Sequence, residues 1–287
     1  MAIIPTIEYE TKLQERLDAP TVWKDVCKVK YTNTGILRNP YLTDATVATG
    51  TRGTGYDSVA SATTDESVTI NTYVYSAQHI DDADLAQKSF SDFMEIADNM
   101  GTMLNEKIET QMLAEHAQWT NFDNASIGGA AGNITVSVSN IKTIIGAMKT
   151  AIRTAGGGDL LARNGGFIVW READYEKVEA LASAEGFNTA DMVLKNGISQ
   201  VNGGFMYLGV MHYSSSKHAA GHVFGGVRQA FMLAIVKSTY GKMKTIINPY
   251  VATNTSQLSG IGLESRVDNK FMAWNKMVPV LFDILVA

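Results

Sequence analysis

Apolar residues recur every three or four positions between Ser89 and Trp119. The stripe that they form includes Met100, Leu104 and Ile108, and this spacing predicts one long amphipathic helix. At 1.5 Å per residue, a helix of about thirty residues reaches about 45 Å, which is longer than most helices of globular proteins. We expect the polar positions beside this stripe to lie on the more solvent-exposed face of the helix: Asp92, Glu95, Asp98, Asn105, Glu106 and Glu109.

A pattern with a period of two residues precedes this helix. From Val68 to Ile80, one set of positions that includes Val74 alternates with a second set that includes Tyr73 and Tyr75. Such alternation predicts a single β-strand of about thirteen residues with two different faces. A strand of this length is long for a globular protein.

Two segments on the N-terminal side have little core of their own. In residues 1–45 we expect one short helix before Pro20 and an extended piece from about Lys28 to Leu37. Residues 46–67 are rich in Thr, Ser, Gly and Ala and would form a flexible linker in isolation. Segments of this kind usually rest on the body of the fold or on another subunit.

The residues after the long helix predict a mixed α+β body. Residues 167–170 (FIVW) are typical of a short buried strand, and residues 171–186 are typical of a helix. Between Met192 and Tyr250 we expect short strands in a separate mixed lobe, followed by two final strands with a turn at Asp268–Asn269. Another helix is predicted earlier, with an apolar face of Ile141, Ile144, Ile145, Met148 and Ile152.

The composition excludes several classes of protein. The single cysteine, Cys27, allows no intramolecular disulfide. The N-terminus lacks the basic and apolar regions of a secretory signal. The longest apolar run, Phe231 to Val236, is far too short to span a membrane. The net charge of −5 argues against a dedicated nucleic-acid binder.

The charges are distributed unevenly along the chain. Residues 46–118 contain three basic and twelve acidic groups, whereas residues 119–287 contain fifteen basic and eleven acidic groups. This asymmetry is typical of a solvated acidic face. It would also suit a protein whose acidic part lies on the basic part of an identical neighbour.

No segment has the pattern of an established catalytic or cofactor site. The phosphate-binding motif GxxxxGK followed by Ser or Thr is absent, and Gly156–Gly158 follows a predicted helix rather than a strand. Asp81, Asp82 and Asp84 lack the glycine and the distal glutamate of a calcium-binding loop. We therefore expect no enzyme activity and no cofactor.

Three histidines, His212, His218 and His222, lie within eleven residues in a segment rich in Ser and Gly. A zinc site needs three or four converging ligands with supporting partners, and this spacing matches no familiar zinc motif. We expect these histidines to lie in a solvated loop without a metal ion. Cys27 lies in a mostly apolar segment, which is more typical of packing than of reactivity.

The order of these elements resembles that of the major capsid proteins of tailed double-stranded DNA phages, which have the Hong Kong 97-like fold. The resemblance reaches individual residues in two segments, 68–87 (VTINTYVYSAQHIDDADLAQ) and 167–181 (FIVWREADYEKVEAL). In the first segment, the matching positions are Val68, Ile70, Tyr73, Ile80, Asp81, Asp82, Ala86 and Gln87.

The resemblance implies a division of the chain into four parts. Residues 1–45 would be an N-terminal arm, and residues 46–80 would be an extended β-hairpin loop. Residues 81–190 and 263–287 would form a peripheral domain that contains the spine helix. Residues 191–262 would form an axial domain that faces the centre of each capsomer.

The resemblance also implies a structural function. Subunits of this family form the hexamers and pentamers of an icosahedral shell around double-stranded DNA, in a virion assembled in the host cytoplasm. We expect the partners to be copies of the chain itself, a separate scaffolding protein, a portal, and DNA without sequence-specific contact, but no membrane. The expected subunit interface, on the extended loop and at the start of the spine helix, consists of Arg52, Tyr56, Asp57, Asp65, Glu66, Tyr73, Tyr75, Asp81 and Asp82.

Two features differ from other members of the family. Some members join their subunits through a loop lysine that bonds to a neighbour's asparagine, but here no lysine lies between Lys30 and Lys88. We therefore expect no such cross-link. The arm also begins at residue 1 without the scaffolding segment of some members, so we expect assembly to need a separate scaffolding protein.

Three alternatives to a phage shell stay open at this point. An encapsulin-type compartment resembles the same fold but encloses cargo enzyme, so particle contents would distinguish it. A hydrolase or transferase with a site in the loops of residues 205–226 would depend on His212 or His222. An adhesin or tail-associated binding module would be a monomer or a trimer in solution.

Overall fold

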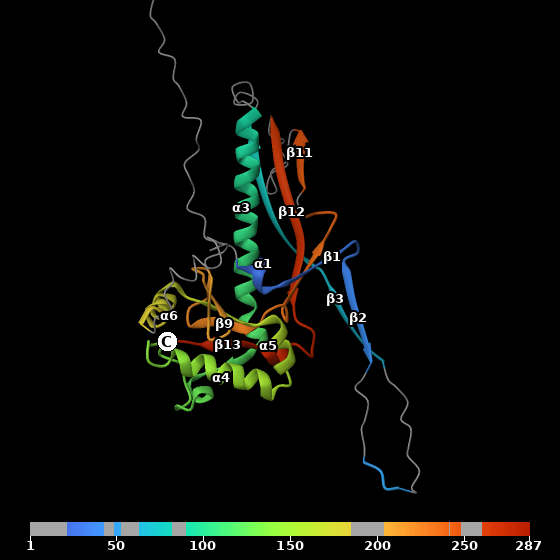
Figure 1. The fold of residues 1–287 in the computed structure, drawn as a ribbon. Coiled ribbons are helices and arrows are strands. Elements are labelled where there is room, and N and C mark those ends of the chain that lie inside the picture. Colours follow the sequence, from blue (N-terminus) through green and yellow to red (C-terminus); the bar gives the residue numbers. More distant parts are fainter. Residues whose placement is uncertain are drawn as a thin grey trace, which may run out of the picture.

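One helix, α3 (Phe90–Ala114), runs along much of the length of the molecule (Figure 1). The computed structural model describes residues 22–42, 49–52, 63–81, 90–184, 204–240, 242–247 and 260–287. Within α3, Met100, Leu104 and Ile108 are buried, so the predicted apolar stripe is confirmed. The helix is shorter than predicted, because the chain tightens into the 3₁₀ turn η1 (Glu115–Gln118) before Trp119.

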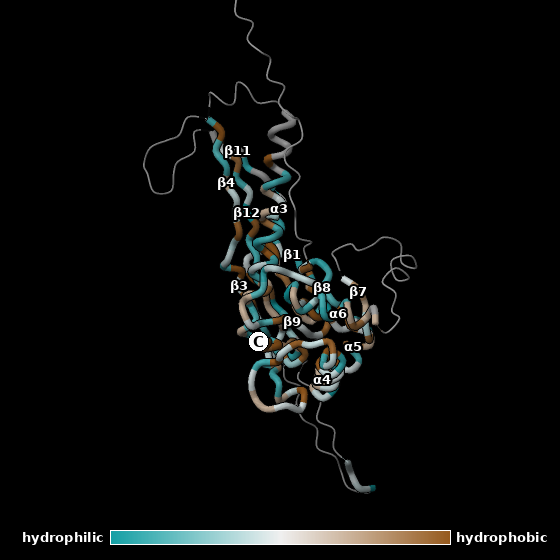
Figure 2. The backbone as a smooth tube through the Cα atoms, turned by 90° about the vertical axis from the view of Figure 1, so that its left-hand side faces the viewer, coloured by the Kyte–Doolittle hydropathy of each residue, from teal (hydrophilic) through white to brown (hydrophobic). Residues whose placement is uncertain are grey.

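A five-stranded sheet lies beside α3, and its central strand is β12 (Ile261–Met272). On one edge, β12 pairs antiparallel with β4 (Thr72–Ile80). On the other edge it pairs with β11 (Met243–Ile247) near its start and with β10 (Met232–Val236) near its end. The outermost strand, β1 (Lys28–Thr32), pairs parallel with β10. Figures 1 and 2 show α3, β4, β11 and β12 side by side as an elongated layer.

The predicted turn at Asp268–Asn269 is wrong, because β12 continues through both residues. Asn269 pairs with Thr72 of β4 and with Ile235 of β10. Its side chain is buried, and its Nδ2 donates a hydrogen bond of 3.1 Å to Oε1 of Gln111 on α3. These partners hold a turn-like sequence in the middle of a strand. Of the two final strands that were predicted, the second is β13 (Leu281–Leu285), which does not follow a turn at these residues.

The predicted thirteen-residue strand is also wrong, since it consists of two strands with different partners. The strand β3 (Thr63–Thr69) pairs with β2 (Ile36–Leu42) in a two-stranded hairpin, whereas β4 pairs with β12. Between them, the N–H of Ile70 donates to the carbonyl of Gly35. The predicted alternation nevertheless holds on β4, because Val74 is buried and the tyrosines on either side of it are exposed.

A second sheet of six strands forms the other part of the molecule, and three helices pack against it (Figure 1). In spatial order its strands are β5 (Thr120–Phe122), β13, β9 (His222–Val227), β6 (Gly166–Trp170), β8 (Val210–Ser214) and β7 (Phe205–Tyr207). The helices are α4 (Ile141–Thr154), α5 (Gly158–Asn164) and α6 (Glu172–Ala184). All five predicted apolar residues of α4 are buried, and so is every residue of β6, which confirms both predictions.

The start of the described chain rests on the body of the fold. The short helix α1 (Trp23–Val26) packs on α3, and Trp23, Val26 and Cys27 are buried in the main core. The segment from residue 204 to residue 247 contributes to both sheets: β7, β8 and β9 join β6, whereas β10 and β11 join β12. Strand pairing therefore does not set this segment apart as a lobe of its own.

Candidate functional site

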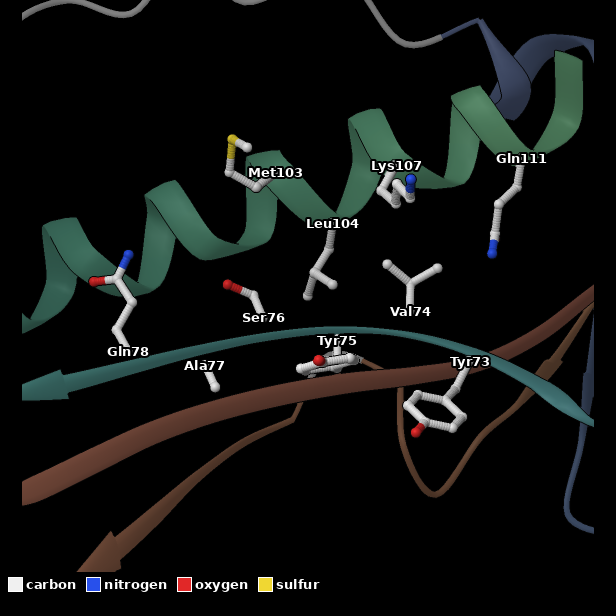
Figure 3. A pocket seen from close by; sticks show the side chains of 10 residues that line it. All are labelled: Tyr73, Val74, Tyr75, Ser76, Ala77, Gln78, Met103, Leu104, Lys107 and Gln111. Carbon is white, nitrogen blue, oxygen red and sulfur yellow. The ribbon is translucent and has the colours of Figure 1, made fainter. Parts of the chain in front are cut away.

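An exposed groove runs between the spine-length helix α3 and strand β4 (Figure 3). Leu104 from α3 and Val74 from β4 point toward each other across it. Met103 and Lys107 also lie on α3, but farther from β4 than Leu104 does. Met103 is 44% exposed, and the groove has a volume of about 440 Å³.

The opposite face of β4 presents two aromatic side chains to solvent. Tyr73 and Tyr75 are 50% and 63% exposed, and their ring centroids lie 5.8 Å apart. They point away from α3 because successive side chains of a strand point to opposite faces (Figure 3). The guanidinium of Arg266 lies 4.0 Å from the ring centroid of Tyr73, so it holds this ring by a cation–π contact.

The β2–β3 hairpin forms a second exposed surface and projects away from α3 (Figure 1). Arg38 and Asp65 form an exposed cross-strand ion pair of 3.6 Å. Glu66 is half-buried and accepts a hydrogen bond of 3.3 Å from the backbone N–H of Asn275, which follows β12. Every other side chain that the structure describes on the hairpin is likewise exposed or half-buried.

The predicted interface residues thus fall on two surfaces rather than at one site. Tyr73 and Tyr75 lie on β4 with the exposed Asp81 just beyond its end, whereas Asp65 and Glu66 lie on β3. Arg52 is exposed in the short described piece of the loop. Three of the predicted residues lie outside the described ranges: Tyr56, Asp57 and Asp82.

Glu109 was expected on the more solvent-exposed face of α3, but it is buried. One oxygen of its carboxylate accepts a hydrogen bond of 2.7 Å from the backbone N–H of Val22, and the other accepts one of 2.6 Å from the Ser215 hydroxyl. Burial raises the pKa of Glu109, and these two hydrogen bonds oppose that shift. Helical periodicity does not identify this residue, because both partners are distant in the sequence.

His212 was expected in a solvated loop, but it is buried in strand β8. Its Nδ1 accepts a hydrogen bond of 2.9 Å from the indole N–H of Trp170, so its Nε2 donates to the Tyr207 carbonyl, 3.3 Å away. Burial lowers the pKa of His212 to about 4. Because both ring nitrogens are bonded to protein groups, His212 is not placed to act as the base of a hydrolase.

A separate group of side chains, His116, His222 and Asp283, lies where η1 meets strands β9 and β13. His222 does not lie in a solvated loop as expected, since it is half-buried at the start of β9. Sequence spacing does not indicate this group, because its members are far apart along the chain. The helices that the structure describes include none that is long and apolar enough to cross a membrane.

Comparison with known proteins gives matches among solved structures alone. No protein-family model and no curated protein matches this chain. A solved chain of Mycobacterium phage Che8 matches with a TM-score of 0.67 and 13% identity, over 98% of this chain and 97% of that chain. The capsid of Ralstonia phage GP4 matches with a TM-score of 0.60 and 10% identity, over 100% and 98%.

A third match is the asymmetric unit of the mature capsid of bacteriophage PhiM1, with a TM-score of 0.60 and 12% identity over 100% of this chain and 92% of that chain. At identities this low, the matches show a similar fold and carry no information about individual residues. Because each alignment covers nearly the full length of both chains, the similarity includes the long helix and both sheets. The chain has the α+β fold of phage capsid chains, as its sequence predicts.

Proposed function

We propose that this chain is the major capsid protein of a tailed phage, a structural subunit that forms the hexamers and pentamers of an icosahedral shell around double-stranded DNA. The β2–β3 hairpin carries the proposal, since its strands pair with each other and its described side chains remain largely exposed. A two-stranded hairpin without a buried face is marginally stable in water. It is stabilised if it lies on a neighbouring subunit, and the shared capsid fold supports this role.

The proposed contact surfaces are the hairpin and the two faces of β4. The exposed tyrosines Tyr73 and Tyr75 would provide apolar area, worth roughly 25 cal/mol per Å² before the cost of ordering the contact. The acidic segment 46–118 would lie on basic surface of the neighbour, with Arg52, Tyr56, Asp57, Asp65, Glu66, Asp81 and Asp82 completing the interface.

The division into arm (1–45), extended loop (46–80), peripheral domain (81–190 and 263–287) and axial domain (191–262) belongs to the same proposal. Its partners would be a separate scaffolding protein, a portal, and packaged DNA held without sequence-specific contact. Assembly would take place in the host cytoplasm. Since no lysine lies between Lys30 and Lys88, denaturing gels of purified shells should show monomers rather than a ladder of covalent oligomers.

Negative-stain microscopy of the purified protein, with and without a scaffolding protein, tests the proposal. We expect capsomers from the protein alone and closed shells of uniform size when the scaffolding protein is added. Shells isolated from infected cells should contain DNA. Assembly should also respond to ionic strength, because exposed charges beyond about 10 Å are screened at 0.1 M salt. A stable monomer at every concentration and salt tested would overturn the proposal, and shells filled with an enzyme would indicate a compartment instead.

A further inference from the structure

Three side chains from distant parts of the sequence meet where the long helix ends. His116 lies on η1, directly after α3, while His222 starts β9 and Asp283 lies in the middle of β13. Each offers one nitrogen or oxygen atom, and these three atoms all lie within 4.8 Å of one another. The group therefore joins the C-terminal end of α3 to the six-stranded sheet.

The distances within the group suit a small cation. The Asp283 oxygen Oδ2 lies 2.9 Å from Nδ1 of His222 and 3.4 Å from Nδ1 of His116. Zinc binds imidazole nitrogen and carboxylate oxygen at about 2.0–2.2 Å, so neighbouring ligand atoms of a tetrahedral site lie about 3.3–3.5 Å apart. The separation from His116 is near this value, the separation from His222 is shorter, and the two nitrogens lie within 4.8 Å of each other. The ligands would therefore have to shift to admit the ion.

Asp283 lies within ion-pair distance of both histidines, but it accepts a hydrogen bond from His222 and not from His116. Asp283 accepts the hydrogen bond of His222, whereas Nδ1 of His116 is buried and has no hydrogen-bond partner in the part of the chain that the structure describes. A buried polar atom without a partner is costly. A cation between Nδ1 and the carboxylate would satisfy it.

A third histidine lies close enough to interact electrostatically with this pair. His218 donates one ring N–H to the Val169 carbonyl, while its Nε2 is buried and lacks a partner among the described residues. His218 is not one of the three residues whose ligand atoms cluster, so it lies beside the group rather than in it.

We propose that His116, His222 and Asp283 form a binding site for a divalent transition-metal ion, of which Zn²⁺ suits the ligands best. Two nitrogens and one carboxylate favour zinc over calcium and magnesium, which prefer oxygen ligands. The two imidazole rings are stacked, with centroids 3.8 Å apart, so binding requires one ring to turn until both nitrogens point at the ion. The partly exposed histidines leave a route from solvent.

The site would fasten three separate segments, η1, β9 and β13, at the junction between the long helix and the second sheet. An ion that binds the folded subunit and not the unfolded chain stabilises the fold by mass action. Metal binding would therefore strengthen the attachment of α3 to the body. This role adds to a shell function and does not depend on it.

The test uses the full-length unassembled subunit, freed of metal by a chelator, with Co²⁺ and Zn²⁺ alone as probes. We expect one Co²⁺ per chain with the intense visible absorption of a tetrahedral site, its loss on addition of one equivalent of Zn²⁺, and a higher melting temperature with Zn²⁺. His116→Gln and Asp283→Asn should each weaken Zn²⁺ binding at least about tenfold. The matched control is His79→Gln, at an exposed histidine of β4, which should leave binding unchanged.

Three results would overturn the site. They are the absence of tetrahedral Co²⁺ absorption in the wild-type subunit, a Zn²⁺ affinity that is unchanged in the His116→Gln variant, and equal losses in this variant and in the His79→Gln control. Since Asp283 is buried and its variant could fail to fold, the wild-type spectrum and the half-buried His116 decide the outcome. Shells purified without chelator should also contain about one zinc per subunit by elemental analysis.

Discussion

The carboxylate of Glu109 accepts a hydrogen bond of 2.7 Å from the backbone N–H of Val22, which lies 87 residues earlier in the chain. The same carboxylate accepts a hydrogen bond of 2.6 Å from the Ser215 hydroxyl. One buried side chain of α3 thus holds both the N-terminal segment and the end of strand β8.

Replacing Glu109 by Ala should destabilise the unassembled subunit by about 2–3 kcal/mol. The change leaves the Val22 N–H and the Ser215 hydroxyl without their charged acceptor, and hydrogen bonds to charged groups contribute about 1.5–3 kcal/mol each. The removal of a buried charge offsets part of this loss. Urea unfolding of the subunit measures the difference.

The matched control for this substitution is Glu106→Ala, one turn earlier on α3. Glu106 is half-buried and forms an ion pair of 3.4 Å with Lys217, so its loss should cost less than about 1 kcal/mol. Equal effects of the two substitutions would show that the hydrogen bonds of Glu109 do not stabilise the subunit.

One part of the stability contribution of Glu109, the part linked to binding of its proton, should depend on pH, whereas its hydrogen bonds to Val22 and Ser215 are tested by the Ala variant. Burial raises its pKa above the ordinary value of 4.5, so the folded subunit binds this proton more tightly than the unfolded chain does. This proton-linked part of the stability is therefore complete below pH 4.5 and is lost as the pH rises through the raised pKa. The free energy of unfolding of the wild type, relative to that of Glu109→Gln, should fall over this pH range. A difference that stays constant with pH would show that the pKa of Glu109 is not raised in the folded subunit.

Tyr75→Ser should impair assembly without unfolding the subunit. Tyr75 is 63% exposed, so the free energy of unfolding should change by no more than about 0.5 kcal/mol. If its ring contacts a neighbour, truncation should cost about 1.4 kcal/mol or more, which raises the critical concentration for assembly about tenfold. Light scattering during assembly measures this concentration.

The control for Tyr75→Ser is Tyr75→Phe, which keeps the apolar ring and removes the hydroxyl. This variant should assemble at nearly the wild-type concentration. If Tyr75→Ser also assembles like the wild type, this face of β4 is not part of the subunit contact. The two variants together separate loss of the ring from loss of a hydroxyl hydrogen bond.

Local periodicity was enough to predict α3, α4 and α6, but it did not predict the short helices α1 and α5 or the polar contacts of α3. The faces of α3 and α4 follow from spacing within the chain, and Leu104 and Met148 are buried as predicted. Glu109 falls beside the apolar stripe and is an ordinary polar position by the same spacing. Its burial depends on Ser215, which is 106 residues away in sequence and close only in the fold.

Strand limits were harder to predict, because they depend on partners rather than on local sequence. Alternation continues from β3 into β4, so nothing in the pattern marks where pairing changes from β2 to β12. Asp268–Asn269 has turn-like composition, yet Arg266 Nε donates to Asp268 over 2.7 Å and Gln111 accepts from Asn269. Polar residues are tolerated within a strand once their groups find such partners.

The Cys27 thiol should be unreactive in the folded subunit. It is buried against Met112, with its sulfur 3.5 Å from the methionine sulfur. Burial, and secondarily the charge of Glu109, raises the pKa of Cys27 well above its usual value, so little thiolate forms at neutral pH. A thiol reagent should label about one group per chain in urea and almost none without it, and rapid labelling of native protein would contradict this placement.

Two glycine-to-alanine substitutions should have opposite effects on stability. A Cβ at Gly226 in β9 would lie 2.6 Å from the carbonyl oxygen of Val280, and backbone atoms cannot move away without disturbing the β9–β13 pairing. Gly226→Ala should therefore destabilise the subunit by about 2–3 kcal/mol. At Gly146 in α4 a Cβ would meet no atom within 4 Å, so Gly146→Ala should stabilise it by about 0.5–1 kcal/mol through helix propensity. Urea unfolding of both variants under the same conditions tests the pair, and a stable Gly226→Ala subunit would mean that β9 and β13 lie farther apart than described.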